Sequence, residues 1–575
     1  MQAVRRLYLY AMSGVTLAVI GVGLATLVDV VITGSGLLEH PYGGPTARER
    51  LSQAVAMLGV GLPVWAVHWW IVQRSLAAGR PDRDAERGST IRAVYITLVL
   101  LVTLIVWVNA ASGLVLGLVV DQLPSLRNYV NVDPVSSAAW AVVGLLAWLY
   151  HGFARRGDLG AGPVTGAASW IPRLYLYGVA LGALLTALAS LGTVVRYAIG
   201  APDEGEVPDA YFLWVAVQSG ISVVAWGLVW FGHWRYADGI VRSEGWRGLA
   251  ERESRTRVAA FVATIIATAA MSLVFLALAI QEVLSPLVVE RAGGAGPLRP
   301  IAAAFISALP WLVAWWAHAR GLRREPMALD PLRALHQDRL MSHGVAAVAL
   351  AIGATGLGWL VGLGIDVAFG GSRTSGAFPG IWTTELTFWL PAAVVGLFFW
   401  AQHWRTVLAR RRADPAGEAN STIRRAFLYL TVAGPLVVAL AAAALILYRI
   451  VNTVLGAALG GNAVSELSTP LGALLAAVLV LAYHGLLLRA DQRLRPVEVP
   501  VEVPAEVPAV TTAPPAGVSA TAAGVPATEA GTASQSSWTR RSLELVGPAG
   551  ADLDAAVAAA RAALPDGFDI VAREP

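Results

Sequence analysis

The sequence predicts an all-α integral membrane protein with about twelve transmembrane helices, followed by a small tethered module. Three observations predict this fold class. Of the 575 residues, 56% are hydrophobic and only 14% are charged, whereas soluble proteins carry about 25% charged residues. The mean hydropathy is +0.61, and apolar runs long enough to cross a bilayer recur along the chain. A soluble chain of this length forms several domains with polar exteriors, and too little charge is present to cover them.

A bilayer core of about 30 Å requires roughly 20 apolar residues in a helix. Windows of that length predict twelve spans, near residues 7–32, 51–72, 92–119, 135–153, 173–199, 211–234, 257–284, 300–319, 340–369, 380–404, 425–456 and 467–488. The first span directly follows Arg5 and Arg6 and lacks a small-residue cleavage site. We therefore expect it to be retained as a helix rather than removed as a signal peptide.

Arginine predicts the orientation, because the chain contains no lysine. The N-terminus, the segments that join one pair of spans to the next and the segment after the last span hold 30 arginines, whereas the loops within pairs hold 8. The positive-inside rule then places both termini in the cytoplasm.

Six of the nine histidines recur at intervals of 81 to 85 residues, each near the end of an even-numbered span. They are His68, His151, His233, His318, His403 and His484. Three residues earlier stand Trp65, Trp148, Trp230, Trp315 and Trp400, with Leu481 in the last copy. This periodicity predicts six two-helix repeats, near residues 1–80, 81–160, 161–245, 246–328, 329–413 and 414–495. Because each repeat holds an even number of spans, the copies are parallel rather than inverted.

The Trp-x-x-His pattern places both side chains on one helix face and allows three interpretations. The first is structural, with tryptophans at the membrane interface and histidines that hydrogen-bond neighbouring helices. The second is a histidine-bordered path for an ion, a proton or a polar solute. The third is metal or haem ligation, although neither cysteines nor carboxylates accompany these histidines. We expect the structural role and predict no metal site.

Ionisable residues also stand where the odd-numbered spans end. They are Asp29, Asp121, Arg196, Glu282, Asp366 and Arg449. Pairing of these groups across neighbouring helices would lower the cost of placing them at the outer interface. The alternative is that they are solvated helix ends. Their order along the chain is acid, acid, base, and then the same again, which suggests a duplication of three repeats. The second and sixth repeats, however, share the opening Ser-Thr-Ile-Arg, as Ser89-Thr90-Ile91-Arg92 and Ser421-Thr422-Ile423-Arg424, which argues against such a duplication.

After the spans, residues 496–537 change to a linker rich in proline, valine, alanine and threonine. Residues 538–575 predict a small cytoplasmic β-α-β-like module, with strands at 541–546 and 568–571 around a helix at 552–564. A free fold of this size is marginal. We therefore expect the module to dock on a protein partner or to associate with another copy.

The odd-numbered helices open with an arginine followed by alternating aromatic residues, as in Arg6-Leu7-Tyr8-Leu9-Tyr10 and Arg173-Leu174-Tyr175-Leu176-Tyr177. Together with a second helix that ends in Trp-x-x-His, this opening resembles the bacterial membrane family called domain of unknown function 5671. The resemblance covers about residues 1–495 in tandem copies. It implies a bacterial membrane protein and brings no reaction, substrate or cofactor.

The composition excludes several function classes. Without cysteine there is no disulfide scaffold and no iron–sulfur or thiol chemistry, and without lysine there is no phosphate-binding loop of the Gly-Lys-Ser/Thr type. The net charge of only +4 disfavours nucleic-acid binding. We expect a non-enzymatic scaffold or sensor of the bacterial inner membrane, without catalytic residues or cofactors and with the lipid bilayer as its partner. A transporter or channel, and a metal- or haem-binding membrane protein, are the alternatives.

Overall fold

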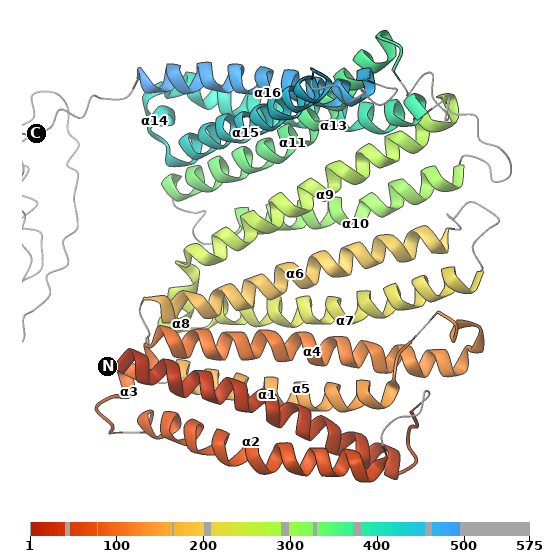
Figure 1. The fold of residues 1–575 in the computed structure, drawn as a ribbon. Coiled ribbons are helices and arrows are strands. Elements are labelled where there is room, and N and C mark those ends of the chain that lie inside the picture. The colour runs from red at the N-terminus through yellow and green to blue at the C-terminus, as the bar shows by residue number, and fades with distance from the viewer. Residues whose placement is uncertain are drawn as a thin grey trace, which may run out of the picture. The chain divides into compact units, whose positions relative to one another are not determined.

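Twelve helices in a computed structural model of the chain are long and apolar enough to cross a membrane (Figure 1). The structure describes residues 2–40, 46–77, 79–129, 131–160, 162–163, 166–199, 209–288, 298–325, 331–371, 381–454 and 463–494. The long helices are α1 (Gln2–Gly34), α2 (Ala47–Ser75), α4 (Thr90–Gln122), α5 (Pro134–Gly160), α6 (Ala167–Ala198), α7 (Asp209–Arg242), α9 (Arg255–Val288), α10 (Leu298–Arg323), α11 (Pro331–Ala368), α13 (Ile381–Ala413), α15 (Thr422–Val454) and α16 (Ala463–Gln492). The prediction of an all-helical membrane domain is confirmed for these residues.

The predicted linker and the predicted β-α-β-like module lie outside the described residues. Among the described residues the regular elements are helices only. The two strands expected at 541–546 and 568–571 therefore gain no support.

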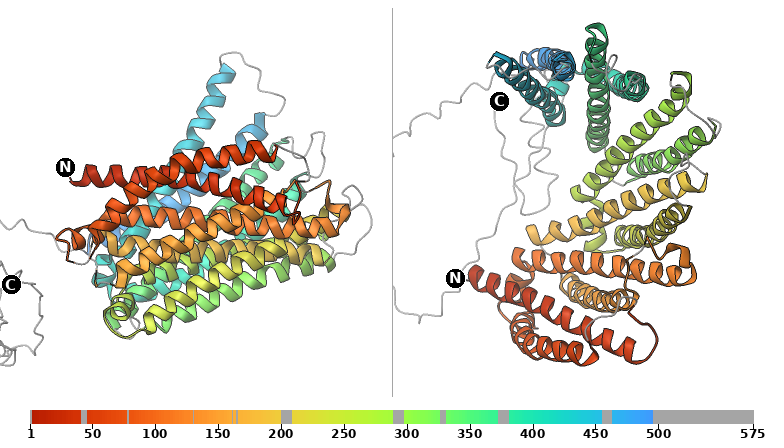
Figure 2. Two further views of the ribbon diagram at one scale, coloured as in Figure 1. Left: turned by 90° about the horizontal axis from the view of Figure 1, so that it is seen from below. Right: turned by 45° about the vertical axis from the view of Figure 1, so that its right-hand side comes forward.

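The long helices pack as six pairs of chain neighbours: α1/α2, α4/α5, α6/α7, α9/α10, α11/α13 and α15/α16. The pairs follow one another in chain order, as two further views of the ribbon also show (Figure 2). The first helix of each pair packs against both helices of the following pair, as α1 does with α4 and α5. The exact repeat boundaries given above stay a prediction.

Among the described residues, three short helices connect pairs at one end of the bundle: α3 (Arg83–Arg87), α8 (Trp246–Arg252) and α14 (Pro415–Asn420). All three lie at the end where α1 begins and where the second helix of each pair terminates (Figure 1). Because the six repeated histidines also lie near this end, we call it the histidine end. A short turn, η1 (Pro124–Leu126), follows α4 at the opposite end.

Glycines set the closest helix contacts. In α11, Gly353 lies against α13 at Gly396, where an added Cβ would collide with backbone atoms. Farther along the same helix, Gly362 lies against α16 at Gly472. Small residues let helix backbones approach closely in membranes, where packing rather than water drives association. The glycines of α11 therefore allow close packing of α13 and of α16 against this helix.

Candidate functional site

A buried ion pair joins α4 to α5 at the histidine end. Arg92 donates to both carboxylate oxygens of Asp158, from Nε over 2.8 Å and from Nη2 over 3.0 Å. Arg92 is 1% exposed and Asp158 is 5% exposed. Such two-pronged pairing satisfies the geometry of both groups and offsets the cost of removing their charges from water.

Tyr10 connects this pair to a second one. Its hydroxyl accepts a hydrogen bond from Arg92 Nη1 over 3.1 Å and donates one to Glu86 Oε1 over 2.6 Å. The other oxygen of Glu86 accepts from Arg6 Nε over 2.7 Å. Two arginines, two acids and one tyrosine thus form a continuous network across α1, α3, α4 and α5. We call this network the first arginine junction.

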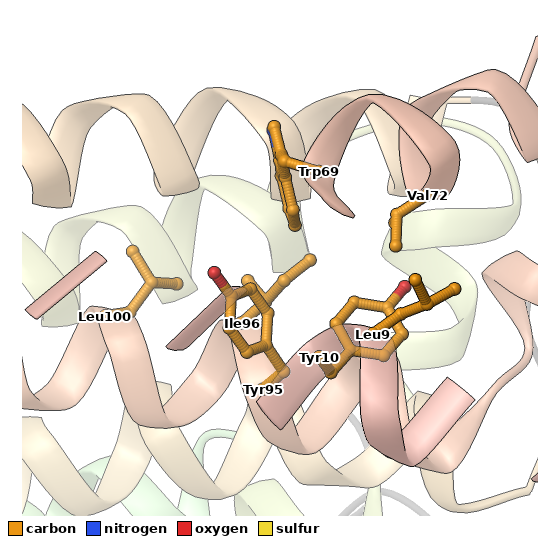
Figure 3. Packing of buried hydrophobic residues seen from close by; sticks show 7 residues of the cluster. All are labelled: Leu9, Tyr10, Trp69, Val72, Tyr95, Ile96 and Leu100. Carbon is orange, nitrogen blue, oxygen red and sulfur yellow. The ribbon is translucent and has the colours of Figure 1, made fainter. Parts of the chain in front are cut away.

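Aromatic rings pack around the first junction. The guanidinium of Arg92 lies 5.9 Å from the ring centroid of Trp69, a cation–π distance. Trp69 in turn lies 5.7 Å from the ring of His151, and Tyr10 lies 5.1 Å from Tyr95. Figure 3 shows Tyr10 and Tyr95 side by side within the hydrophobic cluster that contains Trp69.

The second junction repeats the first about 166 residues later. Arg257 donates to Glu325 from Nε over 2.7 Å and from Nη2 over 2.8 Å. Tyr177 accepts from Arg257 Nη1 over 3.2 Å and donates to Glu251, which also accepts from Arg173 Nε over 2.7 Å. In this copy the Arg257 guanidinium lies 5.7 Å from the ring centroid of Trp234. The ring of Trp234 in turn packs against the ring of His318.

The third junction keeps the ion pairs but lacks the tyrosine. Arg424 pairs with Asp491 over 2.6 Å, and Arg339 pairs with Glu418 over 2.8 Å. At the position of Tyr10, four residues after the first arginine of the junction, stands His343. Its Nδ1 donates to the Arg339 carbonyl.

With histidine in place of tyrosine, three buried polar atoms of the third junction have no hydrogen-bond partner among the described residues. They are Arg424 Nη1, Glu418 Oε2 and His343 Nε2. The first two groups are the counterparts of those that the tyrosine hydroxyl bridges in the other junctions. The third junction is therefore the least satisfied of the three.

The six repeated histidines share one geometry. In each, Nδ1 donates to the backbone carbonyl four residues earlier, at 2.7 to 2.9 Å. This bond leaves Nε2 as an acceptor in the neutral ring. Tyrosine hydroxyls lie near Nε2 in three copies, in the pairs Tyr8–His68 at 3.2 Å, Tyr175–His233 at 3.4 Å and Tyr95–His151 at 3.5 Å.

Burial divides the histidines into two alternating sets. His151, His318 and His484, which belong to the second, fourth and sixth pairs, are at most 7% exposed. His68, His233 and His403 are half-buried. The structure therefore distinguishes alternate pairs, and each arginine junction joins an odd-numbered pair to the pair that follows it.

The predicted tryptophans contact neighbouring pairs as well as their own helix. Trp148 lies 6.4 Å from the His233 ring and donates to the Tyr175 hydroxyl over 2.8 Å. Trp315 lies 6.5 Å from His403, and Trp400 lies 6.2 Å from His484. The other two behave similarly as packing residues: Trp65 stacks on Trp69, and Trp230 packs in the cluster around Leu104 and Val179. The spacing of three residues does not reveal these contacts between helices.

The ionisable residues predicted at the outer interface have varied surroundings. Asp29 pairs with Arg50 of α2 over 3.3 Å and with His40 over 3.2 Å. Arg449 pairs with Glu466 of α16 over 2.9 Å, and Asp121 with Arg127 over 3.6 Å. These partners, Arg50, His40, Glu466 and Arg127, lie outside the predicted set. Of the remaining three, Asp366 is fully buried, Glu282 is half-buried and Arg196 is exposed.

Sequence reasoning did not single out the acids of the junctions. They are Glu86, Glu251 and Glu418 on the short helices, and Asp158, Glu325 and Asp491 near the ends of α5, α10 and α16. Their recurrence at intervals of 165 to 167 residues is a signal in the sequence. Among the described residues, no group of three or more histidines and acids lies close enough together to hold a metal ion.

The family model of the domain of unknown function DUF5671 matches the chain three times, over residues 6–133, 173–313 and 339–483. The matches begin at Arg6, Arg173 and Arg339, the first arginine of each junction. Each match therefore spans the joint between two helix pairs. No curated protein and no solved structure matches the chain.

Proposed function

The chain belongs to the family of the domain of unknown function DUF5671, in three tandem copies, and from this premise we propose that it is a non-enzymatic scaffold or sensor. We place it in the bacterial inner membrane with both termini in the cytoplasm. The histidine end, with its surplus of arginine, then faces the cytoplasm.

The main support for this proposal is that the buried charged groups form hydrogen bonds with one another. In the first two junctions the arginine, acid and tyrosine groups satisfy one another, as Arg92, Asp158 and Tyr10 do. Groups that bind a transported ion or a reacting substrate need unoccupied hydrogen-bonding capacity facing a path. A closed network instead fixes the register of neighbouring helices, which is a structural task.

Packing deeper in the helix pairs supports the same role. Two turns below three of the six repeated histidines stand glycines, Gly61, Gly144 and Gly396. A Cβ at Gly144 would lie 2.9 Å from the side chain of Trp107. A Cβ at Gly396 would collide with the backbone of Gly353. At these two glycines the two helices of the pair are in direct contact.

Single cysteines test the proposal, because the chain has none of its own. Ala314 and Ala477 are buried just below His318 and His484, and cysteine adds little volume there. The control is Ala77, which is exposed at the histidine end. With a charged thiol reagent in inside-out membrane vesicles, we expect rapid labelling of A77C and protection of A314C and A477C in folded protein. Rapid labelling of the two buried positions would favour a transporter with a histidine-bordered path.

Orientation is tested with the same chemistry on intact cells. Ser35, exposed in the turn after α1, lies at the end opposite to Ala77. A reagent that does not cross the membrane should label S35C from outside and leave A77C unmodified. The reverse result would invert the proposed topology.

A further inference from the structure

A large groove lies between the second helix pair, α4/α5, and the third, α6/α7. It has a volume of about 970 Å³ and is lined by residues of α4, α5, α6, α7 and α8. Along α4 the lining runs from Thr97 to Val115, which corresponds to about 27 Å of helix. The groove thus extends over much of the thickness of a hydrocarbon core, about 30 Å.

The wall of the groove is apolar over most of its length. Phe153, Val224 and Leu228 line it and are 63%, 62% and 65% exposed. Gly152, Gly220 and Gly232 also line it, and a Cβ at any of them would meet no atom within 4 Å. The helices therefore leave a space that their own side chains do not fill.

The histidine end of the groove is cationic. Arg155, Arg156, Arg173 and Arg247 line it there, against a single acid, Glu251. That acid is already engaged, because one oxygen accepts from Arg173 Nε over 2.7 Å and the other from the Tyr177 hydroxyl. The other three arginines are left to face an anion.

Arg155 gives the clearest sign of a missing partner. It is only 9% exposed, yet its Nε has no hydrogen-bond partner among the described residues. Its Nη2 makes one long contact, 3.4 Å from the Ala168 carbonyl. A buried guanidinium is costly unless an anion or several acceptors satisfy it.

We propose that this groove binds an anionic phospholipid, with its phosphate at Arg155, Arg156 and Arg247 and its acyl chains along α4 and α7. Arginine binds phosphate oxygens through paired hydrogen bonds, and basic pockets between transmembrane helices bind anionic headgroups. A free phosphate would leave the long apolar wall uncovered. A zwitterionic lipid would bring an ammonium group towards three arginines.

Native mass spectrometry of the full chain tests this site. The protein is equilibrated in detergent with equal amounts of phosphatidylglycerol and phosphatidylcholine of the same acyl length, and the retained lipid is identified. We expect one retained phosphatidylglycerol, preferred over phosphatidylcholine by about tenfold. Equal retention of the two lipids overturns the proposal, as does displacement of phosphatidylglycerol by inorganic phosphate alone.

Two variants separate charge from shape. R156Q/R247Q removes one exposed and one half-buried cation of the groove and should reduce the preference to about twofold. Its matched control is R74Q/R320Q, which removes two exposed arginines near the ends of other second helices, outside the groove. A control that lowers the preference as much as R156Q/R247Q would show a general charge effect and overturn the assigned site.

G220L/G232L fills the groove with side chains and should abolish retention of either lipid. The control G227L lies on the same helix, where an added Cβ also meets open space, but outside the groove lining. Thermal unfolding confirms that each variant is folded. Full retention of phosphatidylglycerol in folded G220L/G232L would place the lipid elsewhere.

Discussion

The Tyr10 hydroxyl donates a hydrogen bond of 2.6 Å to Glu86, although 76 residues separate them in the chain. Glu86 lies on the short helix that leads into the second helix pair, whereas Tyr10 lies on the first helix of the first pair. The same bond joins Tyr177 to Glu251 in the second copy. The bond therefore joins two helix pairs in the first two copies, and each family match spans such a joint.

Removing the bridging hydroxyl should destabilise the protein. Tyr10→Phe leaves Glu86 Oε1 and Arg92 Nη1 buried without this partner, and we expect a loss of about 1–3 kcal/mol in the free energy of unfolding. Tryptophan fluorescence during denaturant unfolding in detergent measures it. The control is Tyr8→Phe, since Tyr8 is 55% exposed and its loss should be small. Equal effects of both variants would contradict a special role for the junction.

The opposite change should stabilise the third copy. His343→Tyr places a hydroxyl near the unpartnered Arg424 Nη1 and Glu418 Oε2. We expect a gain of about 1 kcal/mol, the usual net value of a satisfied buried hydrogen bond. The same unfolding assay measures it, with His343→Phe as the control that supplies the ring without the hydroxyl. A tyrosine variant no more stable than the phenylalanine variant would refute the bridging role.

The number and class of helices were predictable because the bilayer requires about 20 apolar residues for each span. The histidine period of 81 to 85 residues also marked the helix pairs. The joining of two pairs into one unit was harder to predict, because it depends on contacts such as Arg6–Glu86 between residues 80 positions apart. A single sequence shows the residue types of such a pair but not which acid each arginine meets.

The contacts that the predicted tryptophans make were not predictable for the same reason. Helical spacing of three residues places Trp148 and His151 on one face, but Trp148 contacts His233 of the following pair. Periodicity along one helix describes that helix, whereas the junctions depend on how helices from different pairs pack. The 165-residue interval between Glu86 and Glu251 was the available signal.

The buried pair at the first junction should be sensitive to the loss of one partner. Arg92→Met leaves Asp158 buried and unpaired, and we expect a loss of about 3–5 kcal/mol. The double variant Arg92→Met/Asp158→Leu removes both charges and should recover much of this loss, because no uncompensated charge then remains. The surface pair of Asp121 and Arg127 is the comparison, with both side chains more than half exposed.

Thermal and denaturant unfolding of the single and double variants separate the contribution of the Arg92–Asp158 ion pair from that of the other contacts of Arg92. Arg127→Met should cost at most about 1 kcal/mol. A double variant at Arg92 and Asp158 that is as unstable as Arg92→Met would show that the arginine stabilises the junction mainly through Tyr10 and Trp69 rather than through the ion pair.

Helix contact in the third copy depends on the absence of side chains at two facing glycines. Gly396→Ala introduces a Cβ that would collide with the backbone of Gly353, so α11 and α13 must move apart. We expect a loss of about 1–3 kcal/mol from overpacking. Gly434→Ala is the matched control, because a Cβ there meets open space, and it should be neutral or stabilising by up to about 1 kcal/mol through higher helix propensity. Unfolding temperatures that fall for Gly396→Ala and hold for Gly434→Ala would support close backbone contact as the determinant of this pair, whereas equal temperatures would contradict it.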